Sequence, residues 1–152
     1  MKRLFLLLAF AASPALAQVS IDQPWMRATP PGAKVAGGFM TLTNKGASPD
    51  RLVGAASPVA ERVELHVHVH EAGMMKMKQV AGFDVPANGK YVLKPGGGHL
   101  MFIDIKRPIK EGESIPVTLK FEKAGELKVE YPVAGLGAMG PAGAAPSGAM
   151  KH

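Results

Sequence analysis

Histidine and methionine are the residues of this chain whose types and spacing could do chemistry. The sequence contains nine Met, five His and no Cys. From residue 66 to residue 70 every second residue is a histidine, so in an extended strand His66, His68 and His70 share one face. Such imidazoles recur about every 6.6 Å, and one or two of them could ligate a shared metal ion. This stretch alone leaves open the alternative of a half-exposed strand whose outer face is rich in histidine.

Methionines gather directly after this stretch. Met74, Met75 and Met77 follow the turn residues 71–73, so we expect them on the next strand of a hairpin. A single methionine usually fills gaps in a core with its flexible thioether, a role that suits Met26, Met40 and Met75. Three methionines within four residues, beside a histidine-rich strand, are harder to explain by packing alone.

A second histidine–methionine pair follows the glycine run 96–98. His99 and Met101 are two residues apart, so they share one face of a strand while Leu100 points the opposite way. A lone histidine here would more often be structural, but its pairing with a thioether favours a metal site. Thioether sulfur is a soft ligand that selects Cu(I) over Zn, Mg or Ca, and imidazole is compatible with it. An uncharged His₂Met₂ set would suit release of copper to an acceptor.

The absence of cysteine restricts the other chemistry that the chain could perform. Without Cys there is no thiolate nucleophile, Cys-based zinc site, iron–sulfur cluster or blue-copper centre. We see no carboxylate–histidine constellation that would transfer protons in a copper oxidase or dismutase, so we do not expect an enzyme. A structural β-sandwich without metal is the other alternative.

The elements that must position these residues are predicted to be short strands. Val117–Glu122 and Leu127–Tyr131 alternate apolar and polar residues around a short turn at 123–126, which predicts a hairpin. The other predicted strands are 25–27, 38–43, 51–54, 63–70, 75–80, 91–93 and 100–105. Many short strands separated by frequent turns predict an all-β fold, a Greek-key β-sandwich or barrel.

The two ends of the chain differ in composition from its middle. Residues 1–17 combine Lys2 and Arg3, a short apolar run and Ala15-Leu16-Ala17, which predicts a cleavable signal peptide, export to the periplasm and a mature start at Gln18. Residues 18–133 would form one domain, with no further segment that could span a membrane. Residues 134–152 are rich in Gly, Ala and Pro and are predicted to be a flexible tail.

The charge of the chain gives little indication of a partner. The formal net charge is +6, and removal of residues 1–17 would lower it by two. The remaining lysines are scattered, and no arginine-rich or aromatic patch suggests nucleic acid.

The spacing of four residues resembles the signature of the PCuAC family of periplasmic copper(I) chaperones. That signature is a His, ten residues, a Met, twenty-one residues, a His, one residue and a Met, and all four positions match here. The flanking sequence is similar over roughly residues 20–133, chiefly at 25–32, 42–44, 63–66 and 94–101. The resemblance implies a cupredoxin-like fold and four copper ligands, His66, Met77, His99 and Met101.

The resemblance also implies a function and partners. Members of the family deliver copper for assembly of the copper centres of cytochrome c oxidase, so the expected partner is its copper-bearing subunit or another copper-assembly protein. We expect a monomer. Copper storage or resistance stays open, since binding and delivery use the same residues. We expect His68, His70, Met74 and Met75 to be surface residues rather than auxiliary ligands. A secondary site, for Cu(II), would involve the tail residues Met139, Met150 and His152.

Overall fold

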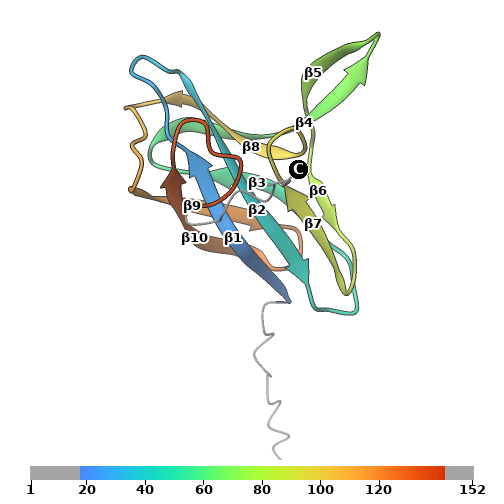
Figure 1. Cartoon of the computed structure of the whole chain (residues 1–152). Coiled ribbons are helices and arrows are strands. Elements are labelled where there is room, and N and C mark those ends of the chain that lie inside the picture. Colours follow the sequence, from blue (N-terminus) through green and yellow to red (C-terminus); the bar gives the residue numbers. More distant parts are fainter. Residues whose placement is uncertain (1–17, 143–152) are drawn as a thin grey trace, which may run out of the picture.

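The computed structural model describes residues 18–142 and folds them into ten β-strands (Figure 1). The predicted signal peptide, Met150 and His152 lie outside the described residues. The strands are β1 (Val19–Arg27), β2 (Val35–Asn44), β3 (Asp50–Ala56), β4 (Ala60–Glu71), β5 (Met74–Gln79), β6 (Phe83–Val85), β7 (Gly89–Leu93), β8 (His99–Ile105), β9 (Ser114–Phe121) and β10 (Gly125–Ala134). Between residues 18 and 142 there is no helix at all, and hence none that could cross a membrane. The all-β prediction is confirmed.

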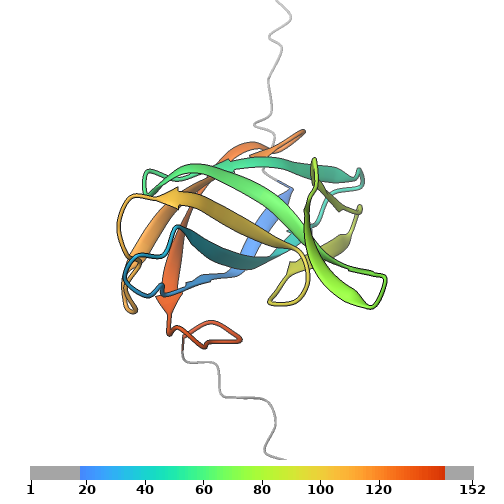
Figure 2. The same ribbon diagram turned by 90° about the horizontal axis from the view of Figure 1, so that it is seen from above.

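Seven of the strands close into a barrel, which Figure 2 shows from above as a ring of strands. The strands are hydrogen-bonded in the order β4, β8, β2, β1, β10, β9 and β3, and β3 returns to β4 where Ala55 pairs with Val63. Neighbours run antiparallel except β1 and β10, which are parallel through Met26 and Val133. The sequence predicted a sandwich or a barrel, and closure between β3 and β4 makes it a barrel.

The interior of the barrel is filled by every second residue of its strands. In β9, Ile115, Val117 and Leu119 are buried while the residues between them are more exposed, as their period of two predicts. Met26 and Met40 are also buried, which confirms their expected core role. The hydroxyl group of Tyr131 donates a hydrogen bond to the thioether sulfur of Met40 at 2.7 Å, so the one polar atom of this buried ring has a partner.

The predicted strands all overlap observed ones, although most of the observed strands are longer. The hairpin around residues 123–126 is present as β9 and β10, with Phe121 opposite Gly125. The end of the strand predicted at 75–80 differs by one residue, since β5 stops at Gln79. Sequence reasoning missed β6, because three residues are too few to show a period.

The outer part of β4 and the whole of β5 form an arm that projects from the barrel (Figure 1). Ala72 and Gly73 connect the two strands with φ angles of 52° and 76°, and positive φ at both central residues is the mark of a type I′ hairpin turn. All six residues of β5 are exposed. The prediction that Met75 lies in the core is therefore wrong: its side chain is 54% exposed, because β5 pairs with β4 beyond the edge of the barrel.

Candidate metal site

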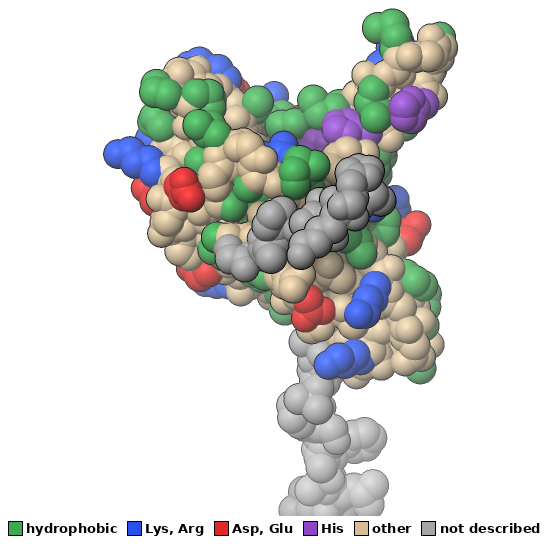
Figure 3. All heavy atoms as spheres, viewed as in Figure 1, with side chains coloured by type: hydrophobic (Ala, Val, Ile, Leu, Met, Phe, Trp, Pro, Cys, Tyr) green, Lys and Arg blue, Asp and Glu red, His purple; other side chains and the backbone are tan. Residues whose placement is uncertain are grey.

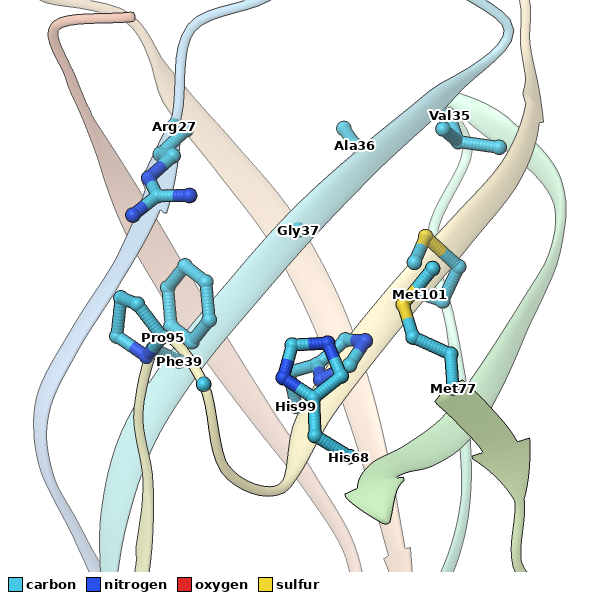
Figure 4. Close-up of a pocket in the computed structure, with 11 residues that line it drawn as sticks. Arg27, Val35, Ala36, Gly37, Phe39, His68, Met77, Pro95, His99 and Met101 are labelled. Atoms are coloured by element: carbon cyan, nitrogen blue, oxygen red, sulfur yellow. The ribbon is translucent and has the colours of Figure 1, made fainter. Parts of the chain in front are cut away.

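A hollow of about 210 Å³ lies where the arm meets the barrel. Its lining includes the side chains of His68, Met77, His99 and Met101, which come from β4, β5 and β8. Figure 4 shows their imidazole and thioether groups directed toward the same space. Figure 3 shows the histidine side chains gathered on this side of the molecule, on and below the arm. In the described part of the chain, no three His, Cys, Asp or Glu side chains converge as metal ligands. Besides the two imidazoles, the groups in this hollow that could bind a metal ion are the thioethers of Met77 and Met101.

Three of the four predicted ligands line this hollow. His99 and Met101 are buried, with 4% and 9% exposure, because β8 lies between β4 and β2 in the barrel wall. Met77 is 55% exposed because it belongs to the arm. The site thus has a fixed inner side on β8 and an accessible outer side on β5.

The fourth predicted ligand, His66, lies next to this group but does not line the hollow. It sits directly opposite His99 in the β4–β8 pairing, so both side chains are on the same face of the sheet, with ring centroids 5.8 Å apart. Its Nε2 is 2.8 Å from a carboxylate oxygen of Glu64. A carboxylate only accepts hydrogen bonds, so Nε2 carries the proton of neutral His66. Its Nδ1 then carries a free lone pair, and this atom is buried and has no hydrogen-bond partner.

His99 is oriented in a similar way from the opposite strand. Its Nδ1 donates a hydrogen bond to the carbonyl oxygen of Gly97 at 3.1 Å, so Nε2 holds the lone pair in the neutral ring. Such a bond at one nitrogen fixes the ring and the tautomer of a metal-ligating histidine. Burial lowers the pKa of His99 below its ordinary value, against the raising effect of the hydrogen bond to Gly97, and the nearby His68 and His66 lower it further. The lowered pKa favours the neutral, ligating form.

The loop before His99 packs tightly enough to fix where the ring stands. Gly98 is buried beside the stacked rings of Phe83 and Tyr91, whose centroids are 4.8 Å apart. A Cβ at this position would lie 2.8 Å from the Tyr91 hydroxyl oxygen. The glycine run therefore brings the backbone closer to these rings than any side chain would permit.

The other histidines and methionines of this region differ in their surroundings. His68 lines the hollow, is only partly exposed, and has its ring centroid 5.2 Å from that of His99. His70 lies two residues further along β4, toward the tip of the arm, and is exposed, as are Met74 and Met75. The expected surface position is thus confirmed for His70 and Met74, and for Met75 against the core role also predicted for it, whereas His68 faces the hollow.

Several features of the site were missed by sequence reasoning. Glu64 is two residues before His66 on the same strand face, so the alternation could have indicated it. Arg27 and Phe39 line the far side of the hollow, where the guanidinium lies 5.6 Å from the ring centroid. These residues come from β1 and β2, and no sequence signal connects them with the histidines. Arg27 also binds the described part of the predicted tail: its Nε donates to the carbonyl oxygen of Ala138 at 2.6 Å.

A closed β-barrel with imidazole and thioether donors in one hollow defines a class of small domain suited to a soft metal ion. The chain belongs to the family described as "Putative lipoprotein LpqE-like", whose model matches residues 19–133. A relative named as a lipoprotein, Lxx21020 of Leifsonia xyli subsp. xyli, is 33% identical over 116 residues, which cover 76% of this chain and 69% of the relative.

Solved structures similar to this barrel include PCuAC domains. The copper-bound PCuAC domain from PmoF2 is 30% identical, with a TM-score of 0.68 and coverage of 78% of this chain and 93% of that one. DR1885 from Deinococcus radiodurans in its Cu(I) form is 36% identical, with a TM-score of 0.61 and coverage of 82% of each chain. The resemblance to the PCuAC family and its cupredoxin-like barrel is confirmed.

Proposed function

We propose that this protein is a periplasmic copper(I) chaperone that holds Cu(I) through His66, Met77, His99 and Met101. The observation that carries the proposal is the meeting of two thioethers and a buried, oriented imidazole in one hollow. Two similar solved structures, the PCuAC domain from PmoF2 and DR1885, contain copper, and the family is one of chaperone-type domains rather than of enzymes.

The individual donors fit a soft monovalent ion. His66 and His99 each have one ring nitrogen engaged by an acceptor and the other free, as ligating imidazoles require. The buried Nδ1 of His66 has no hydrogen-bond partner, an arrangement that costs about 1–3 kcal/mol unless a ligand satisfies it. Two neutral imidazoles and two thioethers leave the charge of Cu(I) uncompensated, which keeps the ion exchangeable.

Anaerobic Cu(I) titration with X-ray absorption at one equivalent tests the donor set. We expect mixed nitrogen and sulfur neighbours, and loss of the sulfur neighbours in the double variant Met77→Leu/Met101→Leu. Met74→Leu is the matched control, because Met74 is exposed on the same arm outside the hollow. Unchanged sulfur scattering in the double variant would refute the assignment.

For the function we propose delivery to copper centres of cytochrome c oxidase, the role that the resemblance implies. The partly exposed outer side of the site supports it, since an acceptor can reach Met77 without unfolding β8. The test is anaerobic mixing of the Cu(I)-loaded protein with the copper-free soluble domain of the copper-bearing oxidase subunit, followed by separation. Copper in the subunit fraction supports delivery, whereas copper retained by this protein indicates storage.

The proposed location is the periplasm, reached through cleavage of residues 1–17. The family and the Leifsonia relative are named as lipoproteins, which indicates the cell envelope. This chain contains no cysteine to carry a lipid. Mass spectrometry of the exported protein should therefore give an unlipidated product that begins at Gln18, and a retained leader would contradict this.

A further inference from the structure

His68 is the histidine of β4 that lines the hollow. It lies directly opposite Met77 in the β4–β5 pairing, whereas His66 lies opposite Gln79. Directly opposed residues of an antiparallel pair point to the same face with their Cβ atoms about 5 Å apart. The arm therefore presents one imidazole and one thioether together, and Figure 4 shows the His68 ring over that of His99.

The distance between the rings also suits a shared ion. Two imidazoles bound to one metal through bonds of about 2.0 Å have their centroids roughly 5 Å apart. The separation is 5.2 Å between His68 and His99 and 5.8 Å between His66 and His99. The Nδ1 atom of His68 is buried without a hydrogen-bond partner, as is that of His66.

We propose that His68 is a second, alternative imidazole ligand, which exchanges with His66 while His99, Met77 and Met101 stay shared. This inference rests on the proposed Cu(I) site and adds a route into and out of it. His66 is tied to Glu64 on the barrel wall, whereas His68 is paired with the exposed arm. An ion that moves from His66 to His68 exchanges one imidazole for another and so moves toward the accessible side without losing its other ligands.

Variants at the two positions give the test. If the ion divides about equally between the two arrangements, loss of either imidazole lowers Cu(I) affinity only about twofold. We therefore expect His66→Gln and His68→Gln each to lower the Cu(I) affinity only slightly. The double variant should lower the affinity more than about tenfold, because it has no second imidazole to bind the ion. His70→Gln is the matched control, since His70 shares the strand face but is exposed outside the hollow.

The result that overturns the proposal is equally specific. If His66→Gln loses as much affinity as the double variant, and His68→Gln changes nothing in either background, His68 is not a ligand. Failure of the Cu(I) site itself would appear separately, as an absence of sulfur neighbours in the unsubstituted protein.

A measurement on the unsubstituted protein covers the case in which a variant does not fold. Cu(I) is diamagnetic, so imidazole ¹⁵N resonances can be followed during anaerobic loading. Shifts in the rings of His66, His68 and His99 together support the exchange, and a His68 ring that stays unchanged at saturation refutes it.

Discussion

The carboxylate of Asp50 should be one of the strongest single supports of the barrel. It is buried, with 7% exposure, and it accepts hydrogen bonds from the backbone N–H groups of Arg51, Lys123 and Ala124 at 2.7, 2.9 and 2.9 Å. The last two donors belong to the turn between β9 and β10, so this side chain connects the start of β3 to a hairpin more than seventy residues later.

The expected effect of Asp50→Ala follows from these contacts. A hydrogen bond to a charged group contributes about 1.5–3 kcal/mol, and a donor left buried without a partner adds a penalty. Water can reach the partly exposed turn and offset some of this loss, so we expect a decrease of about 2–4 kcal/mol in the free energy of unfolding. Asp50→Asn, which keeps one acceptor oxygen, should lose roughly half as much.

Urea unfolding followed by tryptophan fluorescence measures this effect directly. The chain has one tryptophan, and Trp25 is 4% exposed and packs on Phe39, so its emission reports the folded barrel. The midpoint for Asp50→Ala should fall by about 1–3 M urea. Glu122→Ala is the control, an exposed acid near the same turn. A loss for Asp50→Ala within about 0.5 kcal/mol, no larger than at an ordinary surface position, would refute the reasoning.

Three further predictions concern the site and its arm. Hydrogen bonds from His66 and from Arg62 lower the pKa of Glu64, so this carboxylate is charged and can hold the His66 ring in place. Glu64→Gln in a His68→Gln background should therefore weaken Cu(I) binding about 10-fold, measured by competition with a chelator. If this double variant bound Cu(I) as tightly as His68→Gln alone, Glu64 would not orient His66. Ala72→Gly should raise the free energy of unfolding by about 0.5–1 kcal/mol, because glycine adopts the φ of 52° at this position without the steric strain of a Cβ atom. An unchanged or lower urea midpoint would contradict this. Burial lowers the pKa of His99 in the folded state, so as the pH falls the unfolded chain binds a proton at this residue before the folded chain does. The free energy of unfolding of the copper-free protein should therefore decrease as the pH drops below about 6.5. An identical pH profile for His99→Gln would exclude this cause.

Local patterns in the sequence determined which side chains share a face. Strict alternation put His66, His68 and His70 together and separated them from the aliphatic residues between them, because a strand has a period of two. The same rule paired His99 with Met101. The spacing of these residues was enough to indicate the family, and the alternation and turns were enough to predict an all-β fold.

Only the tertiary structure decided how these faces meet. The β4–β8 register puts His66 opposite His99, and the β4–β5 register puts His68 opposite Met77. A shift of one residue in either pairing would turn the donors to opposite faces. Such registers depend on contacts between distant segments, and neither the alternation within a strand nor the spacing along the chain specifies them. For the same reason, the position of His68 in the lining of the hollow and the approach of Arg27 could not be read from the sequence.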